Sequence, residues 1–351
     1  MSYSHPSRRA ILAVGGGIAV SGCIGSIGSD SPGAGTDDVT LLLNWNLSGL
    51  HAPYVAAREN GFYDEAGFTN VELESGDGSD FAANQAGLGN VEFAITSSDQ
   101  LLAANANELS PIAVGIVMQR NPNVVFADRE RFGELAEPAQ LEGATIGSGP
   151  GMVRTMTEAY LAHHGVLDGV DYVDTGFDTI QQLLTGDIDV AGGVFGDVVD
   201  AEQQGGEIET LEVHDVVPSY GHLIATNEAF AEENPDTVRS FLRATARGAV
   251  WAARNPDQAI DLLVDSQPEL DETRANQYEK WAAMHAGYMR SETVETDGWG
   301  TSDSGPWTET YETLAAADFF EGEVDPADVW TNEYLDSDSE YIADYADLTG
   351  E

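Results

Sequence analysis

Residues 39–61 read VTLLLNWNLSGLHAPYVAARENG, and this run introduces the pattern of the folded chain. Its apolar start at 40–43 predicts a strand, and the polar stretch 44–50 predicts a turn. Residues 52–59 predict a helix that ends at Asn60-Gly61. The alternation continues with strands expected at 71–74, 91–95, 112–117 and 123–126 and helices at 79–86 and 99–104. Strands and helices that alternate with short connections predict a parallel sheet covered on both faces.

A second unit of the same kind begins near residue 141. The glycine-rich turn 148–151 separates an expected strand at 144–147 from an expected helix at 152–164. Further strands are expected at 172–174 and 188–193, and further helices at 178–184 and 197–204. The apolar segment 223–226 is expected to return the chain to the first lobe, and helices follow Asn234-Pro235 and Asn255-Pro256.

This order of elements predicts an α/β clamshell of two lobes joined by two crossovers. The chain has 351 residues, which exceeds the size at which single hydrophobic cores stop growing. Lobe 1 is expected at 39–125 and 225–351, and lobe 2 at 126–224. A hinge is expected at the crossovers near Phe126 and Ala225, with a ligand cleft between the lobes.

The charge of the chain excludes two classes of protein. It has 14 Lys+Arg against 61 Asp+Glu, a formal net charge of −47. Hydrophobic residues make up 42% and aromatic residues 9%, so the chain is not a disordered acidic tail. Nucleic-acid binding is excluded because it needs clustered Lys and Arg. The acidity is spread along the whole chain and indicates a halophilic source. Lys280, the single lysine, is expected to be a solvated charge.

The first 22 residues have the features of a twin-arginine lipoprotein signal peptide. Arg8-Arg9 precede an apolar run at 11–20, which is too short for a permanent membrane span. The run ends on Val20-Ser21-Gly22-Cys23, so Cys23 is expected to be lipidated and to anchor the protein at the outer face of the cytoplasmic membrane. Residues 23–38 are expected to form a flexible tether. The alternative is an ordinary signal peptide with a chance cysteine.

Several short segments carry a family resemblance. Leu42-Leu43-Asn44-Trp45 is followed, six residues after the tryptophan, by His51-Ala52-Pro53, and later by the segments at 60–63, 66–68, 141–143, 184–189 and 241–245. In order and spacing they resemble the thiamine-pyrimidine group of type II periplasmic binding proteins. That group includes importer binding proteins for pyrimidine precursors, riboflavin, sulfonates and nitrate, and the fungal pyrimidine synthases. One departure is Leu47, where many importer members carry proline.

The resemblance implies a periplasmic-binding-protein-like clamshell that serves an ABC importer as its solute-binding protein. Its partners would be a permease and an ATPase, since the sequence lacks the Gly-x-x-x-x-Gly-Lys-[Ser/Thr] motif of a motor. The protein is expected to act as a monomer without a cofactor and to bind a thiamine pyrimidine precursor. A sulfonate such as taurine, nitrate and riboflavin stay open as alternative ligands.

Four aromatic residues are candidates for stacking on a small heteroaromatic ring: Trp45, Tyr54, Phe195 and Tyr220. All lie near the ends of predicted strands, where open α/β sheets bind their ligands. Tyr54 and Phe195 fit equally well in the core. Trp45 is the best candidate because it stands in a polar turn between two asparagines.

The polar candidates lie in the same turns or belong to the resemblance: Asn44, Asn46, His51, Ser97, Ser98, Ser148, Gly149, Gly151, Arg154 and Asp197. Residues 148–151 precede a helix, so their backbone N–H groups suit an oxyanion or carbonyl oxygen, or the glycines serve only a tight turn. Asp197 could accept from an exocyclic amine, or lie on the acidic surface. An anionic ligand would need Arg154 or, second, Arg120.

The sequence gives little support for an enzymatic function. Neither His-Glu-x-x-His nor Gly-x-Ser-x-Gly occurs, and the adjacent His163-His164 cannot share a helix face, so no metal site is expected. Cys23 is the single cysteine, which excludes a disulfide framework. The fungal synthases use a pyridoxal-phosphate lysine and a histidine that align with Thr96 and Gln100 here, and their cysteine-rich motif is absent. No catalytic residue is therefore expected.

Overall fold

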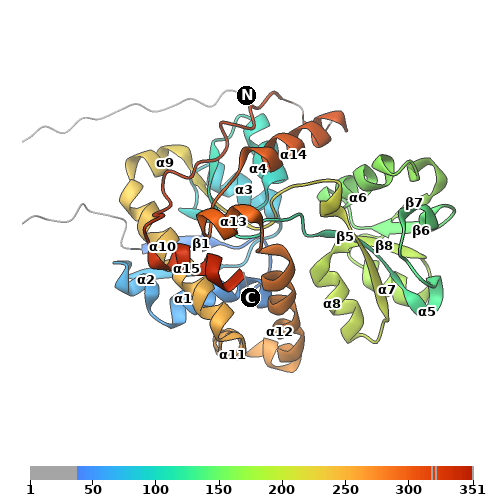
Figure 1. Ribbon diagram of the computed structural model, residues 1–351, viewed down its shortest axis with the longest axis horizontal. Helices are drawn as coiled ribbons and strands as arrows, with labels where there is room; N and C mark the ends of the chain where they lie inside the picture. The colour runs from blue at the N-terminus through green and yellow to red at the C-terminus, as the bar shows by residue number, and fades with distance from the viewer. Residues whose placement is uncertain (1–37, 318, 321, 350–351) are drawn as a thin grey trace, which may run out of the picture. The chain divides into compact units, whose positions relative to one another are not determined.

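The computed structural model describes residues 38–317, 319–320 and 322–349 (Figure 1). The expected signal peptide, Cys23 and nearly all of the tether lie outside these residues. In the described part of the chain, no helix combines the length and the apolar character needed to cross a bilayer.

The first lobe is built on a five-stranded sheet. Its strand order is β2 (Asn70–Glu74), β1 (Asp38–Leu42), β3 (Phe93–Thr96), β10 (Leu223–Asn227) and β4 (Pro111–Ile116). β1 pairs in parallel with β2 and β3, whereas β10 runs antiparallel to β3 and β4. Its connecting helices are α1 (Ala52–Glu59), α3 (Ser79–Gly87) and α4 (Ser98–Ala106), and the long α10 (Pro235–Arg254) packs on α1.

The second lobe repeats this topology. Its strand order is β7 (Asp171–Asp174), β6 (Thr145–Ser148), β8 (Val190–Val194), β5 (Asn123–Asp128) and β9 (Ile208–Glu212). β6 pairs in parallel with β7 and β8, and β5 runs antiparallel to β8 and β9. Its main helices, seen beside this sheet in Figure 1, are α6 (Met152–His163), α7 (Thr179–Thr185) and α8 (Phe195–Gln203).

The expected parallel sheet is found in each lobe except for one antiparallel strand. β5 and β10 are the strands with which the chain enters each lobe from the other, and both run antiparallel to their neighbours. A strand that arrives directly, without a preceding crossover helix in its own sheet, is free to pair in this way. β5 lies entirely in the second sheet and β10 entirely in the first, so the connections are residues 117–122 and 213–222. The expected boundaries near 126 and 225 fall inside these two strands.

The remaining elements complete the two lobes. The helices are α2 (Phe62–Glu65), α5 (Arg129–Phe132), α9 (Glu228–Glu233), α11 (Pro256–Ser266), α12 (Arg274–Ala283), α13 (Glu292–Asp297), α14 (Ser304–Ala316) and α15 (Glu340–Thr349). The 3-10 helices are η1 (Gly49–His51), η2 (Pro138–Leu141), η3 (Leu167–Gly169), η4 (Val213–Asp215) and η5 (Pro268–Thr273), and η6 (Met284–Tyr288) is a π-helix.

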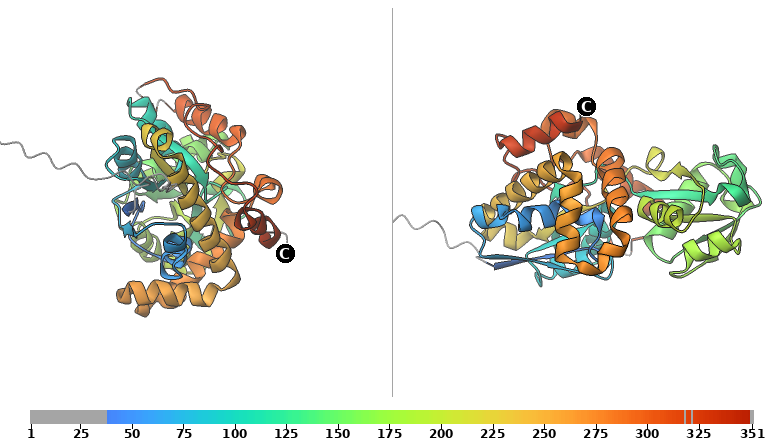
Figure 2. Two further views of the ribbon diagram at one scale, coloured as in Figure 1. Left: turned by 90° about the vertical axis from the view of Figure 1, so that its left-hand side faces the viewer. Right: turned by 90° about the horizontal axis from the view of Figure 1, so that it is seen from below.

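The core of the first lobe centres on α1, α10 and the sheet. Figure 2 shows the yellow-orange α10 beside the blue α1. Gly248 of α10 allows this approach, since a Cβ there would clash with the carbonyl oxygen of Pro53 in α1. Phe241 of α10 stacks on Phe93 of β3, with ring centroids 3.9 Å apart, and on Tyr63. These contacts pack α10 against the start of α1 and against β3, and the turn that leads from β1 to α1 contains Trp45.

Candidate ligand-binding site

The two connections between the lobes, residues 117–122 and 213–222, join each sheet at the edge where its parallel strands end. β1, β3 and β4 of the first sheet end at the edge where β10 begins, and β6 and β8 of the second end at the edge where β5 begins. The carboxyl ends of parallel strands are where α/β sheets place ligands. Most of the site residues expected from the sequence follow the ends of β1, β3, β6 and β8, so the fold places them at these two edges.

The turn after β1 contains the most exposed of the expected site residues with a large aromatic side chain. Trp45 is 48% exposed, so its ring is not part of the core. Asn46 beside it is exposed, and Asn44 is half-buried. Asn44 Oδ1 lies 3.1 Å from Nε2 of His51, which links the two ends of the turn. The turn therefore combines an exposed indole with a neighbouring residue whose amide is held by His51.

His51 is buried and belongs to a pair of stacked imidazoles. Its ring lies 5.6 Å from the ring of His222, with an interplanar angle of 16°. Burial, and secondly His222, lower the pKa of His51 well below its usual value. Burial lowers the pKa of His222 to about 4. Both imidazoles are therefore neutral at pH 7 and add no positive charge to this edge.

His222 was missed by the sequence analysis. The available signal was its position directly before the expected strand 223–226. Its Nδ1 is buried without a hydrogen-bond partner among the described residues, and so is the hydroxyl of Tyr54. Tyr54 itself is fully buried in the core, the second of the two alternatives considered for it, and burial raises the pKa of its hydroxyl. An unpaired buried polar atom is costly, so each of these two needs an explanation.

Ser98 and Tyr220 lie in contact, and their polar groups form hydrogen bonds within the protein. The Tyr220 carbonyl accepts from Ser98 N at 3.1 Å, and Tyr220 N donates to Ser98 Oγ at 3.0 Å. The Tyr220 hydroxyl accepts from Asp303 N at 2.8 Å, and its ring packs edge-on against Trp307. Ser97 is the N-cap residue of α4, and its side chain makes no capping hydrogen bond. These contacts fix the connection to the first sheet, so a direct ligand contact by Ser98 or Tyr220 stays a prediction.

In the second lobe, the backbone conformation and packing of the turn 148–151 require two of its glycines. Gly151 has φ +81°, and a Cβ on Gly149 would lie 2.8 Å from the carbonyl oxygen of Gly176. Ser148 Oγ is engaged, 2.7 Å from the hydroxyl of Tyr172. Arg154 Nε donates to Glu158 at 2.8 Å, so this guanidinium is already paired.

Asp197 and Phe195 open helix α8 at the end of β8. Asp197 Oδ2 accepts from Val194 N at 2.8 Å and so caps the helix, although burial raises the pKa of this carboxyl. The ring of Phe195 stacks on Tyr288, with centroids 4.1 Å apart. The Tyr288 hydroxyl in turn donates to Glu212 at 3.0 Å. Phe195 therefore packs against an element of the first lobe.

Lys280 is not the solvated charge that the sequence suggested. Its side chain is 14% exposed, and Nζ lies 2.7 Å from Asp200 Oδ1. Asn276, on the same helix α12, donates to Asp200 at 2.9 Å. α12 packs on the first-lobe helix η1 whereas Asp200 belongs to α8, so the single lysine joins the two lobes. Sequence reasoning could not find this pair because its partners are remote along the chain.

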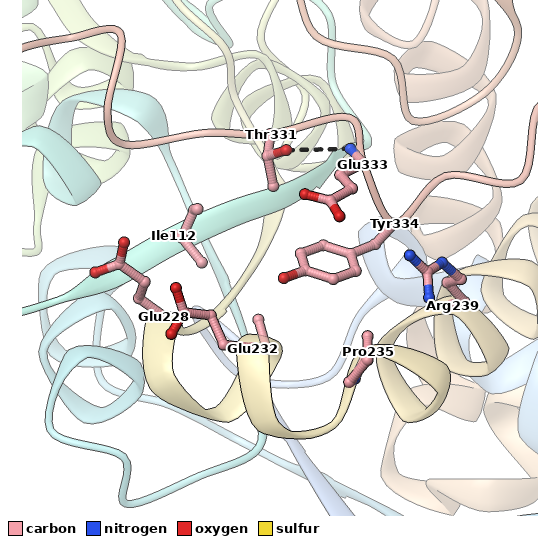
Figure 3. Close-up of a pocket in the computed structure, with 9 residues that line it drawn as sticks. Ile112, Glu228, Glu232, Pro235, Arg239, Thr331, Glu333 and Tyr334 are labelled. Atoms are coloured by element: carbon pink, nitrogen blue, oxygen red, sulfur yellow. Dashed lines mark hydrogen bonds between the residues drawn. The ribbon is translucent and has the colours of Figure 1, made fainter.

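A pocket lies away from both carboxyl edges. It has a volume of about 510 Å³ and is shown in Figure 3. Its lining residues are Ile112, Glu228, Ala231, Glu232, Pro235, Arg239, Thr331, Glu333 and Tyr334. None of the expected site residues lines it. In the described ranges, no cluster of three or more His, Cys, Asp or Glu side chains is arranged to hold a metal ion.

The fold is the two-lobed architecture of periplasmic binding proteins. Residues 49–259 match the family model described as NMT1/THI5 like, and the chain belongs to this family. The aliphatic sulphonate binding protein SsuA from Escherichia coli superposes with a TM-score of 0.67 at 13% identity, over 87% of this chain and 94% of that one. The periplasmic-binding-protein architecture and the family resemblance expected from the sequence are therefore confirmed.

Curated relatives include binding proteins and enzymes. The riboflavin-binding protein RibY of Chloroflexus aurantiacus is 30% identical over 85% of this chain and 86% of its own length. The formylaminopyrimidine-binding protein of Halalkalibacterium halodurans is 25% identical over 84% of this chain and 90% of its own. A 4-amino-5-hydroxymethyl-2-methylpyrimidine phosphate synthase of Legionella pneumophila is 27% identical over 66% of this chain and 74% of its own length.

Proposed function

We propose that this protein is the substrate-binding component of an ABC importer and that it binds a thiamine pyrimidine precursor between the carboxyl edges of its two sheets. The observation that carries the proposal is the half-exposed Trp45 beside the ordered amide of Asn44. A flat apolar face with a few oriented polar groups suits a small neutral heteroaromatic ring. The names of the two binding-protein relatives support this ligand class.

An anionic ligand has less support from the contacts. Arg154, the first candidate for binding a sulfonate or nitrate, is paired with Glu158 and lies 4.9 Å from the Tyr172 ring centroid. His51 and His222 are neutral and add no positive charge at their edge. Riboflavin is the second candidate ligand, because a larger stacked ring could use the same tryptophan and because RibY is 30% identical.

A synthase function is disfavoured by the residues at the aligned positions. In the alignment that the family resemblance implies, Thr96 stands where the fungal synthases have their pyridoxal-phosphate lysine. Its hydroxyl donates to the Ser79 carbonyl at 2.7 Å within a buried strand. The single lysine of the chain, Lys280, is held by Asp200. Position 96 itself therefore offers no amine to form a Schiff base, and we propose binding without catalysis.

A panel of ligands tests the proposal. In high salt, 4-amino-5-hydroxymethyl-2-methylpyrimidine at about 100 times its Kd should stabilise the protein by about 2.7 kcal/mol. That corresponds to a rise of several degrees in melting temperature, measured by thermal shift. Riboflavin, taurine and nitrate complete the panel. A rise with taurine or nitrate alone would overturn the pyrimidine assignment.

We also propose that Cys23 is lipidated and that a permease and an ATPase encoded nearby act with the protein. The support is the sequence around Arg8-Arg9 and Val20-Ser21-Gly22-Cys23. Cys23→Ser should move most of the protein from the membrane fraction to the medium, because the lipid anchor would be lost. Immunoblots of the two fractions measure this, with Ser21→Ala as the control. Retention of the Cys23→Ser variant on the membrane would contradict anchoring.

A further inference from the structure

The hydrogen bonds of His51 reveal which of its nitrogens carries the proton. Ser48 N donates to His51 Nδ1 at 3.2 Å. A backbone N–H can only donate, so Nδ1 must present its lone pair. Because the buried ring is neutral, the proton is on Nε2.

This tautomer in turn sets the orientation of the Asn44 amide. His51 Nε2 lies 3.1 Å from Asn44 Oδ1. An N–H group at Nε2 requires an acceptor, so the amide oxygen faces His51 and the NH2 group faces the opposite way. The two amide orientations are otherwise hard to tell apart, and here the backbone donor of Ser48 decides between them.

The surroundings hold His51 in this position. Its ring is 1% exposed and stacks on His222, and His51 N donates to the Ser48 carbonyl at 2.9 Å. Gly49, at the start of the same 3-10 helix, donates from its N–H to Gln277 Oε1 at 2.8 Å. A Cβ on Gly49 would clash with the Gln277 carbonyl oxygen, so the backbones of η1 and α12 pack in close contact. A residue held in this way is preorganised, and its direction does not depend on the ligand.

We infer that His51 is a positioning residue that turns the NH2 group of Asn44 toward the ligand, so that the site selects a ring with a hydrogen-bond acceptor beside the face stacked on Trp45. This inference rests on the proposed function. In the described part of the chain, no residue accepts a hydrogen bond from Asn44 Nδ2. The acceptor class includes a pyrimidine ring nitrogen and a ring carbonyl oxygen. A ring edge that presents an N–H or ammonium group is rejected, because two donors would face each other.

The sharpest test is Asn44→Asp. The carboxylate can still accept from His51 Nε2–H, but its second oxygen replaces the NH2 donor with an acceptor. Calorimetry with 4-amino-5-hydroxymethyl-2-methylpyrimidine should show a Kd at least about tenfold higher. The matched control is Asn107→Asp, which makes the same change at an exposed asparagine after α4 that is not among the expected site residues, and should change Kd less than about twofold.

Two further readouts separate positioning from a merely structural role. In ligand-free protein, nitrogen-15 NMR should show His51 protonated at Nε2 alone, and an Nδ1–H signal would overturn the inference. His51→Phe should raise Kd by about three- to tenfold because the amide loses its orientation. If Trp45→Ala weakens binding but Asn44→Asp matches its control, this inference fails and the proposed function stands. If neither variant alters binding, the ligand site itself has been misplaced.

Discussion

Trp45→Ala is expected to weaken binding of the pyrimidine by about 1–3 kcal/mol, which is roughly 5- to 150-fold in Kd. The indole is 48% exposed and follows β1 at the carboxyl edge, so truncation removes a stacking face without opening a cavity in the core. Isothermal calorimetry in high salt measures the change. The melting temperature of the ligand-free variant should stay close to that of the wild type, which shows that the fold is intact.

Two control variants make this result specific. Phe177→Ala removes another aromatic side chain, 92% exposed, and should leave the Kd nearly unchanged. Arg154→Gln removes the candidate anion partner, which is already paired with Glu158, and should also matter little. If the ligand were a sulfonate or nitrate held by Arg154, that substitution would instead cost about 2–5 kcal/mol. An unchanged affinity of Trp45→Ala would refute the stacking site as placed here.

Acidification is expected to destabilise the protein, and His222 should account for about 3 kcal/mol of the loss. Burial lowers the pKa of folded His222 to about 4, whereas an unfolded histidine titrates near its model value of 6.5. The unfolded state therefore binds the proton first. The contribution of neutral His222 is complete above pH 6.5 and is lost as the pH falls toward 4. His285, whose pKa burial also lowers to about 4, acts in the same direction.

Buried carboxyls oppose this trend, because burial raises the pKa of Asp197 as well as that of Asp99. Burial raises the pKa of Asp99 to about 6, so its contribution is present at low pH and is lost as the pH rises through 6. The net slope of the wild type between pH 4 and 6.5 therefore understates the effect of His222. The difference between the wild type and His222→Phe isolates it.

Chemical denaturation at constant high salt, from pH 7 to pH 4, measures the free energy of unfolding of both proteins. The His222→Phe curve should be flatter than the wild-type curve by about 3 kcal/mol over this range. His163→Phe, at an exposed histidine of α6, is the control and should parallel the wild type. Equal slopes for His222→Phe and the wild type would show that His222 is not buried in its neutral form.

Local patterns along the chain were enough to predict most of the secondary structure. The helix expected at 52–59 is α1, Ala52–Glu59, with Pro53 in its first turn and Gly61 at φ +73° beyond its end. The strand expected at 223–226 is β10. Such signals act over a few residues, as apolar periodicity, helix caps and turn residues do. β9 was not expected, and the direction of β5 was not visible, because strand pairing depends on distant partners.

For the candidate site too, local sequence predicted some features and tertiary contacts determined the others. The amino-acid order alone placed Trp45 in a polar turn after an apolar strand and identified the family, because both depend on neighbouring residues and their spacing. The folded chain alone revealed that His51 stacks on His222, that Lys280 pairs with Asp200, and that Arg154 is already bound by Glu158. These outcomes depend on burial and on which hydrogen-bond partners meet in space. A polar side chain is free for a ligand only after its protein partners are known, and these are chosen when the core closes.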